Sequence, residues 1–208
     1  MEADVFRPQS VGRAVRTAFV LGVLIVVALV AAFTAVHQFS TLVGDNKKDE
    51  LGRYLDDNAH TTSSPSGAGF KVDFPDPPSR QSEPFAIGVG TLDAKRDRAL
   101  VDDEITFDVV WFQLPAAPSD STQYATALVS LQLHQFSGTQ FGSSGPRAIG
   151  TATSRGFSFD TVDRGGSKRY FDERIIVRGR SVWVLRVGSQ VRRHAAFERF
   201  SDSFTLTS

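Results

Sequence analysis

The feature that most constrains this chain is an uncharged apolar run near its N-terminus, TAFVLGVLIVVALVAAFTAV at residues 17–36. A helix needs about 20 apolar residues to cross the ~30 Å hydrocarbon core of a bilayer. The run is apolar on every face, which argues against a helix in the core of a small domain. It is longer than the apolar part of a cleaved signal, roughly 7–15 residues, and Phe33 interrupts the small residues near its end. We therefore predict an uncleaved transmembrane helix over residues 17–39.

Basic residues beside the run predict its orientation. They are Arg7, Arg13 and Arg16 before it, and Lys47 and Lys48 after it. Positively charged flanks stay preferentially on the cytoplasmic side of a membrane. The arginines outnumber the lysines, and two of them adjoin the apolar edge. We predict a single-pass protein of the plasma membrane, with residues 1–16 as a cytoplasmic tail and the C-terminal domain outside the cytoplasm.

A polar segment separates the predicted membrane helix from the folded domain. Residues 37–57 carry scattered leucines and two glycines, and they are compatible with a membrane-proximal helix or stalk. The alternative interpretation is a contact surface for a partner membrane protein. Residues 58–69, NAHTTSSPSGAG, are rich in Ser, Thr, Gly and Pro and lack large apolar side chains. We predict a juxtamembrane segment and linker over residues 40–69.

Composition narrows the chemistry that is available to the rest of the chain. The 208 residues carry a net charge of zero, so no general attraction to nucleic acid is expected. The sequence has no cysteine. This excludes disulfides, thiolate metal sites, a cysteine nucleophile and a lipid-modified cysteine. The domain must therefore be held together by its core, to which 17 phenylalanines contribute.

Alternating apolar and polar residues predict a β-rich domain over residues 70–208. Alternation with a period of two is typical of strands with one buried face. It predicts strands at 70–74, 80–92, 105–114, 147–153, 156–162, 168–177 and 180–187. Because apolar residues occupy both faces of 105–114, we expect that strand at the centre of the sheet. The charged stretch at 94–103, AKRDRALVDD, is predicted to be a loop or hairpin tip.

Two helices are predicted in the same domain. Ser119, Asp120 and Ser121 offer N-cap oxygens to a helix over residues 121–136, and a short helix follows at 195–200. The two-residue connection Arg178-Gly179 between β-rich segments indicates a hairpin. Sequential strands joined by tight turns, with few helices, predict fold class α+β, an antiparallel β-sheet with flanking helices.

Short motifs mark both ends of the predicted domain. It starts with Phe-x-Val-x-Phe-Pro at 70–75 and ends with Phe-x-x-Ser-Phe at 200–204, after the aromatic strands GFSF, RYFDERIIV and RSVWVL. This pattern resembles the PsbP-like domain family, in particular bacterial envelope members of the actinobacterial type. The resemblance implies an α/β/α sandwich without shared catalytic residues, and an adaptor or accessory role. Many such members look like lipoproteins, whereas this chain has no cysteine and a predicted membrane anchor.

No constellation of catalytic or metal-binding groups is visible. The histidines His37, His60, His134 and His194 lie in separate regions without metal-ligand spacing. The acidic run at 102–104 is expected to be solvated, with a loose calcium site as the alternative. Asp172 and Glu173 are adjacent in a strand, so we expect them on opposite faces, as solvated charges. We predict no enzymatic activity, no cofactor, no metal and no nucleic-acid partner.

A concentration of basic residues on or near the predicted hairpin is the candidate interaction patch. Its members are Lys168, Arg169, Arg174, Arg178, Arg180, Arg186, Arg192 and Arg193. One interpretation is that charged edge strands resist aggregation. The other is a binding surface for an acidic protein, an anionic lipid or a cell-wall polymer.

Two functions fit these features. In the first, the chain is a non-enzymatic, membrane-anchored accessory or adaptor protein. Its helix contacts membrane lipid, and its outer domain binds or caps a larger membrane complex, such as respiratory or secretion machinery. In the second, it is an envelope binding module that holds a lipid or an anionic cell-wall ligand beside the sheet. A hydrolase is the weakest alternative, since the sequence offers no nucleophile or metal constellation.

Overall fold

The computed structural model of the protein describes residues 50–56, 58–87, 90–162 and 165–207. The predicted cytoplasmic tail, the transmembrane helix and most of the juxtamembrane segment fall at residues 1–49, outside the described residues. Among the helices that are described, none is long and apolar enough to cross a membrane.

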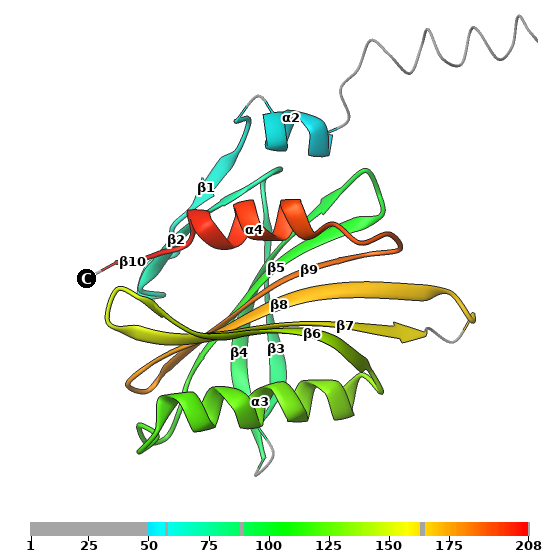
Figure 1. Cartoon of the computed structure of the whole chain (residues 1–208). Helices are drawn as coiled ribbons and strands as arrows, with labels where there is room; N and C mark the ends of the chain where they lie inside the picture. The colour runs from blue at the N-terminus through cyan, green and yellow to red at the C-terminus, as the bar shows by residue number, and fades with distance from the viewer. Residues whose placement is uncertain (1–49, 57, 88–89, 163–164, 208) are drawn as a thin grey trace, which may run out of the picture. The chain divides into compact units, whose positions relative to one another are not determined.

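The core of the fold is a seven-stranded antiparallel sheet with the strand order β3-β4-β5-β9-β8-β7-β6 (Figure 1). Its strands are β3 (Ser79–Ala86), β4 (Thr91–Val101), β5 (Ile105–Gln113), β6 (Thr139–Ile149), β7 (Ala152–Val162), β8 (Lys168–Arg178) and β9 (Ser181–Ser189). Neighbours in the sheet are neighbours in sequence, except that β9 returns to pair with β5. This return brings the two most apolar strands together at the centre of the sheet.

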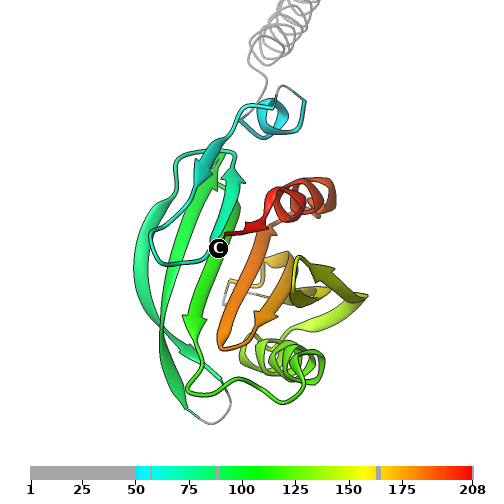
Figure 2. The ribbon, with the colours of Figure 1, turned by 90° about the vertical axis from the view of Figure 1, so that its left-hand side faces the viewer.

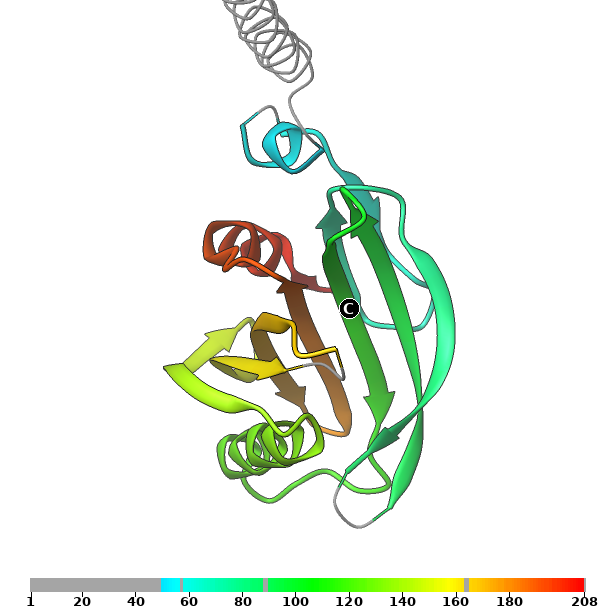
Figure 3. The same cartoon turned by 90° about the vertical axis from the view of Figure 1, so that its right-hand side faces the viewer.

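Helices flank both faces of this sheet, which confirms the α+β class. One face is covered by α3 (Ser121–Gln135). The other is covered by α4 (His194–Ser203), α2 (Glu50–Asp56) and a small sheet of β1 (Thr61–Ser63), β2 (Phe70–Phe74) and β10 (Thr205–Leu206). Figures 2 and 3 show α3 and α4 well apart, with β8 and β9 between them.

Side-chain alternation on the central strands builds two separate cores. On β9, Trp183 and Leu185 belong to the core beneath α4, whereas Val182 and Val184 belong to the core beneath α3. Successive side chains of a strand point to opposite faces, so one strand supplies both cores. Beneath α4, the ring of Phe200 lies 5.0 Å from that of Phe74. The phenylalanines expected to fill the core thus join segments far apart in sequence.

The charged stretch at 94–103 was predicted to be a loop or hairpin tip. The prediction was wrong for residues 94–101, which are strand, and only Asp102-Asp103 lies at the tip of the β4–β5 hairpin. The stretch forms most of β4, and the turn at Asp102-Asp103 has left-handed backbone angles, with φ of 50° and 56°. Its Arg96, Asp97 and Arg98 pair with charges on neighbouring strands, whereas Lys95, Asp102 and Asp103 are exposed. Arg98 lies directly opposite Asp108 of β5, and the carboxylate of Asp97 accepts two hydrogen bonds from Arg80 of β3. Opposite charges that face each other in a sheet stabilise the strand pairing.

The other predicted elements are present, with shifted boundaries. The two predicted helices are α3 and α4, and the predicted hairpin is β8–β9, with Gly179 at φ 58°. The predicted strand at 80–92 covers most of β3 and the start of β4. Strand β6 begins at Thr139, well before the predicted start at residue 147. Its Gly and Pro residues are accommodated because β6 is an edge strand with register shifts.

Residues 50–69, predicted as juxtamembrane segment and linker, pack against the domain. The fully buried side chain of Tyr54 in α2 donates a hydrogen bond to the carbonyl of Asp73, at 3.0 Å. Strand β1 pairs with β2, and the indole of Trp183 donates to the carbonyl of Ala68 at 2.9 Å. The compact unit that contains the sheet accordingly extends from Asp49 to Ser208.

Candidate functional site

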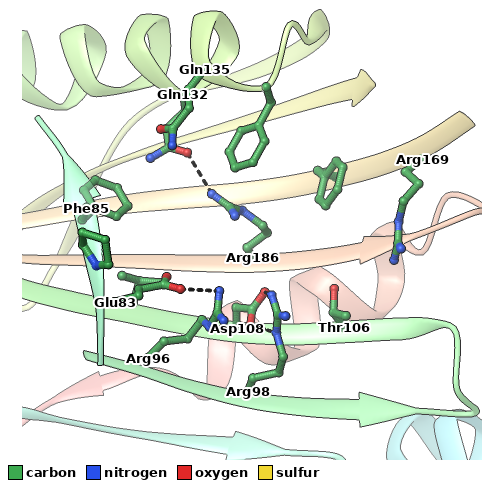
Figure 4. Close-up of a pocket in the computed structure, with 14 residues that line it drawn as sticks. Glu83, Phe85, Arg96, Arg98, Thr106, Asp108, Gln132, Gln135, Arg169 and Arg186 are labelled. Carbon is green, nitrogen blue, oxygen red and sulfur yellow. Dashed lines mark hydrogen bonds and ion pairs between the residues drawn. The ribbon is translucent and has the colours of Figure 1, made fainter. Parts of the chain in front are cut away.

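A pocket of about 400 Å³ opens between the sheet and the C-terminal end of α3 (Figure 4). The basic side chains in its lining are Arg96 and Arg98 from β4, Arg169 from β8 and Arg186 from β9. Apolar lining comes from Phe85, Val110, Phe136 and Phe171. Small-molecule sites in proteins occupy about 300–1,000 Å³ and combine an apolar wall with a few placed polar groups. The pocket has that size and that composition.

A row of alternating charges crosses the sheet at this pocket. The strand register places Arg98 opposite Asp108, Asp108 opposite Arg186, and Arg186 opposite Glu173. The row therefore spans β4, β5, β9 and β8 on the face toward α3. Each charge has a neighbour of opposite sign on an adjacent strand, which is why this polar row is tolerated within a buried sheet face.

The ion pair at Asp108 uses both oxygens of its carboxylate. Arg98 donates from Nε to Oδ1 at 2.6 Å and from Nη2 to Oδ2 at 2.9 Å. Asp108 is only 1% exposed, and these hydrogen bonds raise the pKa of Arg98. A carboxylate held in this bidentate way fixes the position of the arginine.

Glu173 lies deeper and is only partly satisfied. Its Oε2 accepts a hydrogen bond from Arg186 Nε at 2.6 Å, whereas its Oε1 has no partner among the described residues. Burial raises the pKa of Glu173, the neighbouring Arg186 opposes that shift, and the charge of Asp108 adds to it. Burial therefore opposes the charged form of Glu173 more than Arg186 supports it.

Three buried N–H donors around the pocket also lack a hydrogen-bond partner within the described part of the chain. They are Arg96 Nε, Arg169 Nε and Gln132 Nε2. The orientation of the Gln132 amide is fixed, because its Oε1 accepts from Arg186 Nη2 at 2.9 Å. An unsatisfied buried donor costs roughly 1–3 kcal/mol. A bound group that offers acceptor oxygens would remove that cost.

Aromatic rings form one side of the pocket. The ring of Phe136 lies 4.8 Å from the guanidinium carbon of Arg186 and stacks 6.3 Å from Phe171. Phe171 in turn stacks 5.0 Å from Phe159. Gly188 of β9 makes this arrangement possible, because a Cβ atom there would lie 2.5 Å from the ring of Phe171. The pocket thus sets an apolar wall beside its N–H donors.

The structure divides the predicted basic patch between the two faces of the sheet. Arg169 and Arg186 line the pocket described above, and Arg174 and Arg192 line a second pocket of about 380 Å³ beside α4. The others lie outside both pockets: Lys168 pairs with Asp160, Arg178 lies over Trp183, Arg180 donates to the carbonyl of Leu114, and Arg193 precedes α4. The eight residues therefore do not form one continuous surface.

The second pocket brings a serine, an aspartate and a histidine together. Ser158 donates its hydroxyl hydrogen to Asp172 Oδ1, and His194 Nδ1 lies 3.4 Å from the same oxygen. In a nucleophilic triad the imidazole stands between the hydroxyl and the carboxylate and takes the proton. Here the carboxylate stands between the other two groups. The arrangement therefore lacks the link through which a histidine activates a serine.

The remaining candidate groups from the sequence lie apart from both pockets or are already paired. His60 lies in the connection between α2 and β1, His134 lies on α3, and His37 falls outside the described residues. Within the described ranges, no cluster of three or more His, Cys, Asp or Glu side chains has the geometry of a metal site. Asp172 and Glu173 face opposite sides, as expected. Their expected solvation was wrong, since they are 6% and 0% exposed and hold polar partners.

Several residues of the pocket are absent from the predicted patch. Arg96 and Arg98 lie in the segment predicted to be a loop or hairpin tip, and Asp108 lies within the predicted strand at 105–114. The i, i+2 spacing of the two arginines is a sequence signal for this site, because residues two apart in a strand lie on the same face. Their pairing with Asp108 depended on recognising β4 as the neighbour of β5.

Comparison with known proteins finds similarity among solved structures. No protein-family model matches the sequence, and no curated protein matches it. Among solved structures, the chain is similar to LpqN, which is involved in cell envelope biogenesis of Mycobacterium tuberculosis. The TM-score is 0.43 at 13% sequence identity, and the match covers 74% of this chain and 95% of the LpqN chain.

Proposed function

We propose that this protein is a non-enzymatic binding module of the cell envelope, and that the pocket between the sheet and α3 holds its ligand. One observation carries the proposal: the pocket sets unpartnered N–H donors and four arginines beside aromatic rings. Such a site is suited to binding, because its donors are fixed by the strands before a ligand arrives. A non-enzymatic role is supported by the order of groups in the second pocket.

The location at the membrane is part of this proposal. The predicted transmembrane helix at 17–39 is the anchor, and residues 40–49 connect it to α2. Even a fully extended chain covers only ~3.3–3.6 Å per residue, which limits the reach of this connection to about 35 Å. Since Tyr54 ties α2 to the domain, the module would work close to the membrane surface.

A PsbP-like fold is also proposed here. The motifs that suggested the resemblance lie at 70–75 and 200–204, and they pack against each other in one core. The rings of Phe70 and Phe204 stack at 5.4 Å, and those of Phe74 and Phe200 lie 5.0 Å apart. The two motifs therefore have one structural role, which is to join the two ends of the domain in a shared core.

The binding function can be tested by measuring which small molecules stay bound to the purified protein. Full-length protein is extracted from its native membrane in mild detergent, and its bound small molecules are compared with those of two variants by native mass spectrometry. Gln135→Trp places a large side chain in the pocket from an exposed position on α3. Gln123→Trp makes the same change at an exposed position of α3 away from the pocket.

We expect a ligand on the wild type and on Gln123→Trp, and about tenfold less of it on Gln135→Trp. Thermal unfolding of all three proteins checks that the variants fold. Equal retention by all three proteins, or none by any of them, would contradict the proposed pocket.

The adaptor role is the second candidate function. It is favoured by the docking of α2 on the domain, which would hold any contact with a larger complex at a limited distance from the membrane. Gentle solubilisation of the native membrane followed by size exclusion tests it. Elution as a lone small protein, with no co-eluting partner, would reject this role.

A further inference from the structure

We infer that the domain docks on a bilayer of anionic lipid through an exposed patch of apolar and basic side chains at one end of the sheet. This end patch consists of Phe141, Val162, Tyr170 and Val191 with the basic residues Lys168 and Arg192. The inference rests on the membrane location in the proposed function. It goes beyond that function, because it gives the domain its own contact with the membrane in addition to the predicted anchor.

Exposed apolar side chains are concentrated in the end patch. Val162 and Val191 are 65% and 59% exposed, and Phe141 is 39% exposed. In the part of the chain that the structure describes, one further large apolar side chain is exposed to a comparable degree, Leu100 on β4. A single exposed apolar residue is normal on a protein surface, whereas a group of them marks a contact with another molecule or with a membrane.

Strand register and side-chain contacts make the end patch continuous. Val162 lies opposite Lys168 across the β7–β8 pair, and the ammonium group of Lys168 lies 5.2 Å from the ring centre of Tyr170. The rings of Tyr170 and Phe141 meet edge to face at 6.2 Å, and Arg192 lies over Phe141 at 4.4 Å. Side chains from β6, β7, β8 and the connection after β9 thus form one surface.

The connection between β9 and α4 adds an apolar side chain and positive charge. Ser189, the last residue of β9, lies opposite Tyr170, and Val191 follows two residues later. Arg192 and Arg193 come next. Neither arginine has a carboxylate partner among the residues that the structure describes. The end patch therefore carries positive charge beside its apolar side chains.

This mixture of side chains fits the interface of an anionic bilayer. Tyrosine is enriched at membrane interfaces, because its ring is apolar and its hydroxyl can stay hydrated. Arginine and lysine lay their apolar stems along lipid while their charged groups meet the headgroups. Anionic lipids attract such basic side chains. Arg192 and Arg193 supply this charge, since Lys168 is paired with Asp160 at 3.0 Å.

The connection to the predicted anchor is short enough to hold the end patch near the bilayer. Residues 40–49 reach at most about 35 Å, and they end at Glu50, the first residue of α2. Helix α2 covers the same face of the sheet on which the end patch lies, because Tyr170 alternates with the residues of β8 that face α3. In Figure 1, β7 ends and β8 begins at one end of the sheet.

Docking through the end patch would also bring the pocket beside α3 close to lipid. On β8, Lys168 and Tyr170 of the patch alternate with Arg169 and Phe171, which line that pocket from the opposite face of the sheet. One strand end therefore belongs to both surfaces. A ligand that enters or leaves the pocket would do so next to the bilayer.

The test measures how near the end patch lies to lipid, and it uses the absence of cysteine from the chain. Val162→Cys, Val191→Cys and Leu100→Cys each carry one fluorophore in the full-length protein. The proteins are inserted into nanodiscs of phosphatidylcholine, with or without phosphatidylglycerol, and quenching by spin-labelled lipid is measured. Leu100 is the matched control, because it is 48% exposed and lies on the opposite face of the sheet.

We expect strong quenching at positions 162 and 191 when phosphatidylglycerol is present, and weaker quenching there in phosphatidylcholine alone. Little quenching is expected at position 100 in either lipid. Read at position 162, Arg192→Gln should shift the docking equilibrium about fivefold toward the undocked domain, the effect of one cation near an anionic surface. Arg180→Gln changes an exposed arginine at the other end of the β8–β9 hairpin and should leave the quenching unchanged.

A second pair of variants tests the apolar part of the end patch. Phe141→Ser removes the exposed ring beneath Arg192 and should reduce quenching at position 162. Leu100→Ser removes an exposed apolar side chain on the opposite face and should leave it unchanged. Thermal unfolding checks that both variants fold. Equal effects of the two substitutions would overturn the apolar contact.

The other outcomes separate this inference from the proposed function. Equal quenching at all three positions, or none at 162 and 191, would overturn the docking face. Quenching that is independent of phosphatidylglycerol would overturn the anionic lipid. Protection of positions 162 and 191 in native membranes alone would assign the patch to a protein partner and overturn the inference. Failure of the protein to enter nanodiscs would overturn both the inference and the proposed membrane location, whereas insertion without quenching would overturn the inference only.

Discussion

At Glu173, burial and ion pairing act in opposite directions on one carboxyl group. The side chain is 0% exposed, and removal from water favours its neutral form, whereas the hydrogen bond from Arg186 favours the charged form. Burial is the larger effect, so the pKa is raised. The groups that face this carboxyl are Arg186 of β9, Asp108 of β5 and, through Arg186, Gln132 of α3. A single residue thus links the charge of the pocket to pH.

Replacement of Glu173 by glutamine tests this balance. Because its pKa is raised above the ordinary value of 4.5, the stability that Glu173 contributes is fully present below that pH. It is lost as the pH rises through the folded-state pKa. Glu173→Gln cannot ionise, so its free energy of unfolding relative to the wild type should rise between about pH 5 and about pH 8.

Chemical denaturation of the full-length protein, followed by tryptophan fluorescence at both pH values, measures this difference. Glu198→Gln, at a partly exposed carboxylate on α4, is the control. A constant difference between Glu173→Gln and the wild type across the pH range would show that Glu173 ionises as an ordinary glutamate.

At the scale of elements, β9 contributes two features to the pocket. One is the charge of Arg186, and the other is the space that Gly188 leaves for the ring of Phe171. Arg186 pairs with charged residues on both neighbouring strands, and two positions further along Gly188 leaves room for the ring of Phe171. A glycine inside a strand often marks a place where another group approaches closely. Its role here is steric, because the ring stack that forms the apolar wall depends on it.

Gly188→Ala should disrupt that wall. The added Cβ would lie 2.5 Å from Phe171 Cε1, so the ring must move out of its stack. Overpacking of this kind costs roughly 1–3 kcal/mol, measurable as a loss in the free energy of unfolding. Gly142→Ala is the matched control, since the nearest atoms there lie at 3.5 Å, an ordinary contact. Equal stability of the two variants would contradict a steric role for Gly188.

At the scale of the whole molecule, Tyr54 is a central contact between α2 and the rest of the domain. Its ring meets the edge of Phe107 at 5.7 Å, its hydroxyl donates to Asp73, and Arg199 lies over its face at 4.8 Å. These contacts join α2 to β5, β2 and α4. Tyr54 is therefore one of the contacts on which the proposed link between membrane and pocket depends.

Tyr54→Ala should release α2 from the domain. Loss of a buried aromatic side chain costs about 3–5 kcal/mol, and the peptide bond after Arg53 should become open to trypsin. Tyr54→Phe keeps the ring and loses one hydrogen bond, at a cost of about 1 kcal/mol, and α2 should stay protected. Limited proteolysis of the full-length variants gives the comparison. Unchanged resistance of Tyr54→Ala would mean that other contacts hold α2.

The sequence alone determined the features that depend on local patterns. The alternation around residues 105–114, the N-cap at Asp120 and the turn at Gly179 predicted β5, α3 and the β8–β9 hairpin, since periodicity and turn geometry involve only nearby residues. Of the pocket, the sequence singled out Arg169 and Arg186, and it placed them in one surface with residues of the opposite face.

Only the tertiary structure determined which charged residues form pairs between strands. Thr106 and Gly188 are paired across 82 residues of sequence, and the same register brings Asp108 against Arg186. That register turned the charged segment 94–103 into a strand, because its side chains find partners of opposite sign on β3 and β5. The physical reason is that a strand's neighbours are selected by the packing of both sheet faces, which no local pattern contains.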